Sequence, residues 1–134
     1  MGINSGAYFC KAVHYEVLTE SQMQGLYYCT DCQVVGGSSH WTSCAVAPSD
    51  FRLLEGALTP YTYDPGSGRE VTRHFCGACG TQIMVQSDEL GVASVNAMTF
   101  DDATKFTPQI AYFGGSVPRW CEVDSRLTAL GDAE

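Results

Sequence analysis

Two cysteine pairs with the same spacing are the residues of this chain best suited to chemistry. Cys29 and Cys32 form the first Cys-x-x-Cys pair, and Cys76 and Cys79 form the second within the segment Phe-Cys-Gly-Ala-Cys-Gly. Each pair can aim two sulfurs at one ion, so two such pairs in a short chain indicate zinc binding. We expect the glycine after each cysteine of the second pair to adopt positive φ and turn the backbone beneath the thiolates. A redox dithiol, or buried cysteine that packs as a small hydrophobe, is the alternative.

The composition restricts the partners. The chain has 134 residues, seven of them Lys or Arg, and a net charge of -8. Nucleic acids and anionic membrane surfaces both attract clustered basic residues, so we expect neither as a partner. The partner could still be a small molecule that is neutral or carries a thiol. The length fits one domain over residues 1–134, in which residues 122–134 form an acidic, loosely attached tail without periodicity.

The cysteine count indicates the compartment. The chain has seven cysteines, an odd number, and its first residues show no basic region followed by an apolar run. Without a secretory signal, these cysteines fit metal ligands in a reducing compartment better than a disulfide framework. No segment approaches the ~20 apolar residues of a membrane helix. We therefore expect a soluble, unexported, cytoplasmic protein whose thiols are free or bound to metal.

Short strands separated by turns are expected to position the cysteines. Aromatic and β-branched residues predict strands over residues 7–17, 40–47, 51–55, 82–86, 92–98 and 110–113, and a short extended piece over 61–63. A short apolar run over residues 25–28 ends at the first cysteine pair. Pro48, Ser49 and Asp50 predict a turn that joins the strands over 40–47 and 51–55 into a hairpin. A turn or short helix with a glycine stop is expected at residues 34–39, and one helical turn at 101–105. The strongest loop signal is Asp-Pro-Gly-Ser-Gly at residues 64–68, ahead of the second cysteine pair.

The order of these motifs resembles the GFA family, the family of glutathione-dependent formaldehyde-activating enzyme and centromere protein V. The resemblance covers residues 6–127, and the Cys-Gly-x-Cys-Gly segment with the upstream Cys-x-x-Cys-Gln is its most specific part. The other matching residues are Gly6, Cys10, Ala12, Val13, Tyr15, Gly36 or Gly37, Phe51, Gly56, Tyr61 or Tyr63, and Arg73. The resemblance implies a mainly β fold, a β-tent of small antiparallel sheets stapled by zinc, with few short helices. It also implies two zinc sites.

The first implied zinc site is the structural one. In the family, a Cys-x-Cys on the first strand joins the late Cys-x-x-Cys, and the residues that match here are Cys10, Cys76 and Cys79. Tyr8 stands where the first cysteine of the Cys-x-Cys would be. One ligand is therefore missing, because structural zinc has four protein ligands. The candidates to complete the site are Cys44, Cys121, His74 and His14, or an exchangeable water in the open position.

The second implied site is a labile zinc near the thiol substrate, held in the family by Cys-x-Cys-x-x-Cys. Cys29 and Cys32 match its last two cysteines, and Tyr27 stands in place of the first. Two thiolates are too few for firm zinc retention unless Tyr27, Asp31, Cys44 or a substrate thiol contributes. We therefore expect one firmly held zinc and a second that depends on such a ligand. The spacing alone also allows a single site made of all four cysteines of the two pairs.

The resemblance implies a zinc-dependent enzyme of the carbon-sulfur lyase type that acts on a thiol-aldehyde adduct or a related carbonyl substrate. Its partner would be a small molecule, such as the thiol glutathione. Cys29, Cys32 and Tyr27 would lie at the substrate, where a tyrosine can donate a proton to a developing oxyanion. His74, close to the second cysteine pair, could act as a general base.

Other functions stay open because each zinc site lacks a ligand. A GFA-like enzyme could be recruited to another carbonyl, dehydration or isomerisation reaction in a biosynthetic pathway. A non-catalytic, zinc-stapled module that binds a partner is the second alternative, in which Tyr8 and Tyr27 fill space left by lost ligands. A dithiol redox protein that uses Cys29 and Cys32 is the third, although the chain lacks the alternating strand and helix pattern of thioredoxin-like folds.

Overall fold

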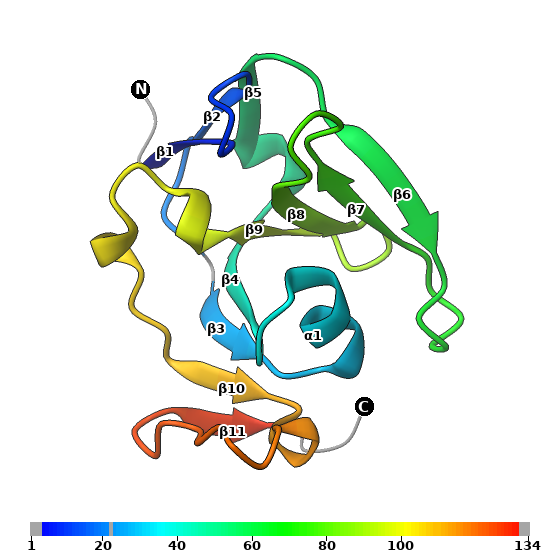
Figure 1. The fold of residues 1–134 in the computed structure, drawn as a ribbon, viewed down its shortest axis with the longest axis vertical. Coiled ribbons are helices and arrows are strands. Elements are labelled where there is room, and N and C mark those ends of the chain that lie inside the picture. The colour runs from blue at the N-terminus through cyan, green and yellow to red at the C-terminus, as the bar shows by residue number, and fades with distance from the viewer. Residues whose placement is uncertain (1–3, 22, 132–134) are drawn as a thin grey trace.

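Strands are the main regular secondary structure in the part of the chain that the computed structural model describes, residues 4–21 and 23–131 (Figure 1). These residues form eleven strands in two sheets, one α-helix and four short 3-10 helices. The strands are β1 (Asn4–Ala7), β2 (His14–Val17), β3 (Met23–Tyr27), β4 (Trp41–Val46), β5 (Phe51–Glu55), β6 (Thr59–Tyr63), β7 (Val71–Phe75), β8 (Gln82–Ser87), β9 (Val92–Asn96), β10 (Ile110–Tyr112) and β11 (Thr128–Leu130). The helices are α1 (Thr30–Gly36), η1 (Pro48–Asp50), η2 (Ala97–Thr99), η3 (Ala103–Lys105) and η4 (Gly114–Ser116). The expected mainly β fold is confirmed.

The smaller sheet is antiparallel, with the strand order β1-β2-β5. The prediction of one strand over residues 7–17 is wrong, because a tight turn separates β1 from β2. In this turn Lys11 adopts a φ of 63° and its N–H donates to the carbonyl of Tyr8 at 2.9 Å. The N–H of Tyr8 in turn donates to the carbonyl of Val13 at 3.2 Å. The turn carries Cys10 at its tip and so brings it out of the sheet.

The larger sheet has eight strands in the order β11-β10-β3-β4-β9-β8-β7-β6. Its pairs are antiparallel except β3 with β10 and β10 with β11, which are parallel. The predicted hairpin of β4 and β5 is wrong, since β5 pairs with β2 of the smaller sheet. The turn η1 sends the chain from one sheet to the other, and the N–H of Leu18 donates to the carbonyl of Asp50 at 2.8 Å.

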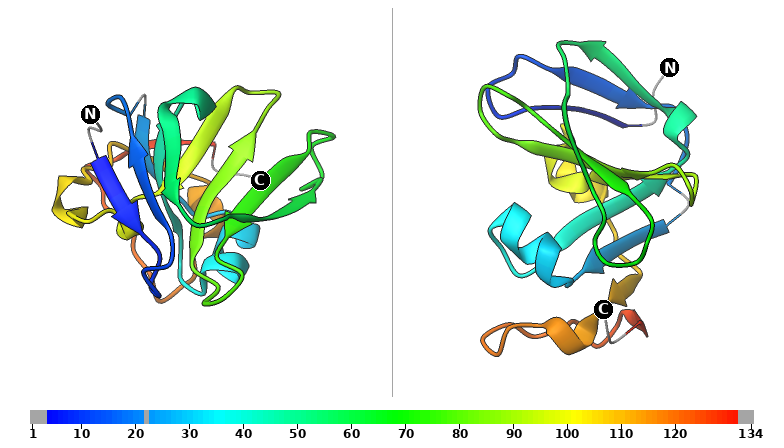
Figure 2. Two further views of the ribbon diagram at one scale, coloured as in Figure 1. Left: turned by 90° about the horizontal axis from the view of Figure 1, so that it is seen from above. Right: turned by 90° about the vertical axis from the view of Figure 1, so that its right-hand side faces the viewer.

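The core lies between the smaller sheet and the neighbouring part of the larger sheet (Figure 2). It contains Tyr8, Val13, Tyr15, Val17, Cys44, Val46, Cys76, Ile83, Met84, Ala93, Val95, Ala97 and Phe100. Tyr15 of β2 stacks on Phe51 of β5 with ring centroids 5.0 Å apart, and its hydroxyl lies 2.6 Å from that of Thr99. Burying each large side chain of this kind contributes about 2 kcal/mol, so the two sheets stabilise each other.

The helix α1 follows β3 directly and contains Cys32. As expected, a glycine ends it: Gly37 adopts a φ of 66° and its N–H donates to the carbonyl of Gln33. The amide of Gln33 donates to the carbonyls of Tyr28 and Ser116, both at 2.9 Å, and so fixes the helix against β3 and η4. The helix starts earlier than predicted, because Cys29 is already its N-cap.

The predicted loose tail contains a strand that the sequence did not indicate. β11 pairs with β10 at the end of the larger sheet far from β1, β2 and β5 (Figures 1 and 2). Residues 132–134 of that tail lie outside the described residues. None of the helices in the described segments has the length and hydropathy of a membrane span.

Candidate functional site

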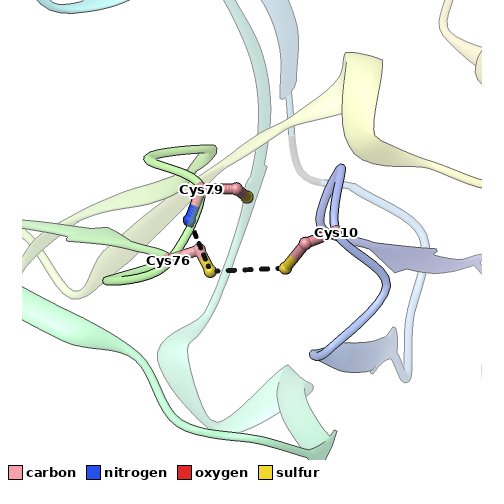
Figure 3. A group of neighbouring side chains, drawn as sticks. All are labelled: Cys10, Cys76 and Cys79. Atoms are coloured by element: carbon pink, nitrogen blue, oxygen red, sulfur yellow. Dashed lines mark hydrogen bonds between the residues drawn. The ribbon is translucent and has the colours of Figure 1, made fainter.

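Three cysteines from the two sheets meet at one point. Cys10 comes from the turn between β1 and β2, while Cys76 and Cys79 come from the loop between β7 and β8 (Figure 3). The three sulfurs lie within 4.8 Å of one another, and those of Cys10 and Cys76 are 3.7 Å apart. Among the described residues this is the one group of three or more side chains that could hold a metal ion. The structure therefore contains the grouping implied by the family resemblance, and the alternative site made of both cysteine pairs is wrong.

The loop between β7 and β8 is shaped to direct its two sulfurs together. The N–H of Cys76 donates to the carbonyl of Thr81 at 2.9 Å, and the N–H of Gly80 donates to the carbonyl of Cys76 at 2.8 Å. The N–H of Cys79 points at the sulfur of Cys76, 3.5 Å away. Gly80 has the expected positive φ of 79°, but Gly77 does not belong to the residues with positive φ. Close approach explains Gly77 instead, since a Cβ there would lie 2.9 Å from the hydroxyl of Thr59.

The surroundings of the three thiols favour a bound cation. The hydroxyl of Thr81, 3.1 Å from the sulfur of Cys79, and then its backbone N–H lower the pKa of the Cys79 thiol to about 6. Tyr8 is fully buried in the core, and its hydroxyl has no hydrogen-bond partner within residues 4–21 and 23–131. Burial, and then the charges of Cys76, Cys79 and Cys10, raise the pKa of Tyr8. This phenol therefore stays protonated and can donate to a metal-bound thiolate.

Zinc fits this donor set, since three thiolates are the soft ligands that it prefers. The candidates for a fourth ligand, Cys44, Cys121, His74 and His14, do not belong to the group. Cys44 is buried in the core, and the thiol of Cys121 lies 3.7 Å from the carbonyl of Glu122. Cys10 and Cys79 are exposed, so solvent reaches the cluster.

The first cysteine pair is bonded in a different way from that expected. Cys29 and Cys32 form a disulfide, whereas the sequence predicts free or metal-bound thiols. Cys29 is the N-cap of α1 and is partly exposed, and Cys32 lies in the first turn and is buried. Disulfide sulfur carries no thiolate charge, so zinc binding by this pair requires its reduction. That role stays a prediction for the reduced form.

A cavity of about 580 Å³ lies against the disulfide. It is lined by Tyr27, Cys29, Asp31, Cys32, Trp41, Tyr63, Pro65, Gly66, Ser67, Val71, Arg73, Val85, Ser94 and Phe113. Three of the four catalytic candidates, Tyr27, Cys29 and Cys32, meet here. His74 does not line the cavity, and its catalytic role stays a prediction. Burial lowers the pKa of the His74 imidazole, and Gln86 and Asp88 partly offset this effect. Neither ring nitrogen of His74 makes a hydrogen bond of good geometry with a described residue.

Tyr27 is held in the cavity wall by neighbouring rings. Its ring lies 4.7 Å from that of Tyr112 and 6.5 Å from that of Phe113, measured between centroids. The parallel pairing of β3 with β10 brings these rings together. Burial, and then the charge of Tyr112, raise the pKa of Tyr27, while a hydrogen bond with Ser43 lowers it in part. The phenol of Tyr27 is therefore protonated at neutral pH and can act as a proton donor.

Arg73 is a residue of the cavity to which the sequence reasoning gave no role. It is only 6% exposed, and its Nε donates to the hydroxyl of Tyr63 at 2.9 Å. Its guanidinium carbon also lies 5.7 Å from the centroid of the Tyr63 ring. Its Nη1 is buried, and no described residue forms a hydrogen bond with it. Arg73 is the middle residue of β7, the strand before the second cysteine pair, and it is the buried residue of that strand. Side chains alternate between the two faces of a strand, so this position is the sequence signal that could have indicated an arginine facing inward.

A second cavity of about 410 Å³ lies beside the metal loop. Gly80 and Thr81 of that loop line it, together with His40, Gln82 and other residues. Trp41 of β4 lines both cavities.

Comparisons with known proteins agree with this geometry. The family described as glutathione-dependent formaldehyde-activating enzyme (GFA) matches residues 3–116. A crystal structure of a Rhodobacter sphaeroides protein is similar with a TM-score of 0.57 and 24% sequence identity, over 72% of this chain and 87% of that chain. This likeness shows the fold alone. A search of curated proteins found no match. The family match covers most of the chain and includes both cysteine pairs, and the chain therefore belongs to the GFA family.

Proposed function

We propose that this protein is a zinc-containing enzyme of the carbon-sulfur lyase type. Its substrate would be a thiol-aldehyde adduct or a related carbonyl compound, with glutathione or another small thiol as the sulfur partner. The family description supports this proposal, because glutathione and formaldehyde combine through a carbon-sulfur bond. One structural observation carries it: Tyr27, the Cys29–Cys32 pair and Arg73 meet in one cavity of about 580 Å³, a volume suited to a small molecule.

The reaction makes or breaks a bond between sulfur and a carbon that bears oxygen. In the cleavage direction the adduct's hydroxyl loses its proton, the carbonyl forms, and the sulfur leaves as a thiolate. In the opposite direction the thiolate attacks the carbonyl carbon and the oxygen takes up a proton. Tyr27 is the group that we assign to this oxygen, because its protonated phenol lines the cavity and can donate the proton when the adduct forms. In cleavage, the phenolate form of Tyr27 takes up the proton that the adduct's hydroxyl loses.

The two cysteine clusters would have different tasks. Zinc held by Cys10, Cys76 and Cys79 would stabilise the fold, since none of these residues lines the larger cavity. A zinc ion held by reduced Cys29 and Cys32 with a substrate thiol would lower the pKa of that thiol. We assign the proton movement to Tyr27 rather than to His74, which does not line this cavity. On the sequence grounds given above, we place the reaction in the cytoplasm.

The test is the rate at which ¹³C-formaldehyde and glutathione exchange with their adduct, followed by exchange NMR on zinc-loaded, reduced protein. Wild-type protein should accelerate the exchange, and Tyr27→Phe should reduce the acceleration by ~10²-fold or more, the usual scale of general acid catalysis. Cys29→Ala should also reduce it while leaving the fold intact. Tyr61→Phe is the matched control, because Tyr61 is 63% exposed on β6 and does not line the cavity.

The contradicting outcomes point to the alternatives. If wild-type protein accelerates no exchange with several thiols and aldehydes, the carbon-sulfur lyase proposal is wrong and a non-catalytic binding module is favoured. If Tyr27→Phe and Tyr61→Phe behave alike, the assignment of Tyr27 fails. A GFA-like enzyme recruited to another carbonyl, dehydration or isomerisation reaction would then be sought with substrates that lack sulfur.

A further inference from the structure

The Cys29–Cys32 disulfide is placed for chemistry rather than for stability. It joins residues only three positions apart. A crosslink that closes so short a loop removes little entropy from the unfolded chain. Both cysteines line the larger cavity, and Cys29 is partly exposed while Cys32 is 5% exposed. A small molecule in the cavity can therefore reach the disulfide, and Cys29 is the more exposed of its two residues.

The same cavity contains a buried positive charge without a negative partner. Arg73 is only 6% exposed, and its Nη1 has no hydrogen-bond partner among the residues that the structure describes. Neither ion pair in the described part of the chain includes Arg73. Among the described residues, the one acidic residue that lines the cavity is Asp31, which is exposed. A buried charge without a partner is costly, so the cavity is suited to a ligand that brings an anionic group to Arg73.

We propose that this cavity carries out thiol-disulfide exchange with small thiols that bear a carboxylate. Arg73 binds the carboxylate, and the thiolate of the bound molecule attacks the sulfur of Cys29. The bond between the two cysteine sulfurs breaks, the new disulfide joins the small molecule to Cys29, and Cys32 leaves as a thiolate. A second thiol then attacks the mixed disulfide, which releases the oxidised small molecule and leaves both cysteines reduced.

A small-molecule disulfide from solution then restores the Cys29–Cys32 disulfide. It oxidises Cys29 and Cys32 again and is itself reduced to two thiols, so electrons and atoms balance over the cycle. A disulfide in a reducing compartment is usually transient and catalytic, in agreement with this use. The proposal does not depend on the carbon-sulfur chemistry proposed above, although the two would share the cavity.

The test compares three thiols of similar size that differ in charge: 3-mercaptopropionate, 2-mercaptoethanol and cysteamine. The whole, zinc-loaded protein is first oxidised with hydroxyethyl disulfide, and opening of the Cys29–Cys32 bond is followed by mass spectrometry after acid quench. Rates are expressed per thiolate present. The protein has a net charge of -8, which attracts the cation cysteamine and repels 3-mercaptopropionate. We nevertheless expect 3-mercaptopropionate to react fastest, by roughly tenfold over 2-mercaptoethanol, the scale of one charge-assisted hydrogen bond.

Variants test whether the preference for 3-mercaptopropionate depends on Arg73 itself or on the overall charge of the protein. Arg73→Gln should abolish the preference for 3-mercaptopropionate, and Arg73→Lys should retain part of it. Arg52→Gln is the matched control, because Arg52 lies on β5 of the other sheet and pairs with Glu16 at the surface. If Arg73→Gln does not fold, Tyr63→Phe removes the acceptor of Arg73 Nε and should weaken the preference. Cys32→Ser should accumulate the mixed disulfide on Cys29.

Two results would overturn the proposal. In the first, cysteamine opens the Cys29–Cys32 disulfide of wild-type protein faster than the other two thiols. This would show that the overall charge of the protein, and not Arg73, determines which thiol reacts fastest. The other is quantitative alkylation of Cys29 and Cys32 after oxidation, which would show that they form no disulfide. Both readouts follow cysteine chemistry alone, so they can fail while the carbon-sulfur exchange assay succeeds, or the reverse.

Discussion

The sulfurs of Cys10 and Cys76 lie 3.7 Å apart although the residues are 66 positions apart in the chain. Cys10 belongs to the turn between β1 and β2 of the smaller sheet, and Cys76 follows β7 of the larger sheet. A zinc ion bound here would therefore join the two sheets beside the core that they share. Zinc binding at this point would therefore contribute to folding stability.

The loss of a thiol from this cluster should unfold the protein. We expect Cys76→Ala to remove zinc and to lower the melting temperature by more than ~10 °C, because zinc binding contributes several kcal/mol of folding free energy. Treatment of wild-type protein with a chelator should have the same effect. Cys121→Ser is the control, since Cys121 lies outside the cluster. Calorimetry with zinc analysis checks this, and a Cys76→Ala protein with unchanged melting would contradict the structural role.

Tyr8→Phe should have opposite effects with and without metal. In the metal-free protein the Tyr8 hydroxyl is buried without a partner, so its removal should stabilise the fold by about 1 kcal/mol. In the zinc-loaded protein the phenol can donate to a thiolate, so its removal should weaken zinc binding. Urea unfolding of both forms, with a competition assay for zinc, measures the two effects. A change of the same sign in both forms would show that the hydroxyl does not interact with the thiolates.

Thr81 should control the reactivity of Cys79 in metal-free protein. Hydrogen bonds from the Thr81 hydroxyl and then its N–H lower the pKa of Cys79 to about 6, so Cys79 is a thiolate above that pH. Thr81→Val removes the hydroxyl and should move the pH profile of Cys79 alkylation upward, so that alkylation at pH 7 slows roughly several-fold. Thr81→Ser keeps a hydroxyl and should resemble the wild type. Peptide mapping after iodoacetamide treatment gives the profile, and an unshifted profile in Thr81→Val would refute the effect.

Gly25 should be essential for the parallel pairing of β3 with β10. A Cβ at Gly25 would lie 2.7 Å from Cγ1 and 3.2 Å from the carbonyl oxygen of Ile110. Gly25→Ala should therefore destabilise the protein by about 1–3 kcal/mol, the usual cost of overpacking, and disturb the rings around Tyr27. Gly36→Ala is the matched control, because a Cβ there meets nothing within 4 Å and alanine favours the helix. Equal stability of the two variants would contradict the close packing of these strands.

Local patterns in the sequence predicted much of the fold. The strand Phe51–Glu55 was predicted with the observed bounds, and the loop predicted over residues 64–68 lies within the observed loop over residues 64–70, because these residues have strong local preferences. The pairing partner of that strand was not predicted, since pairing depends on residues far away in the chain. The turn at Lys11 was also missed, because a lysine with positive φ gives no glycine signal.

The candidate site was predictable to a similar degree. Spacing and resemblance together implied that Cys10 joins Cys76 and Cys79, and the structure places these three together. The disulfide of the other pair could not be read from spacing, because the same Cys-x-x-Cys also suits a metal ligand pair. The cavity role of Arg73 depends on Tyr63 and on the neighbouring strands, which only the folded chain brings together.

The most direct test of the account is zinc analysis with zinc-edge X-ray absorption on wild-type protein and on the Cys29→Ser/Cys32→Ser double variant. We predict one firmly held zinc per chain with three sulfur ligands, and the same ion and ligands in the double variant. Wild-type protein without zinc, or a double variant that loses its zinc, would contradict the metal site of Cys10, Cys76 and Cys79.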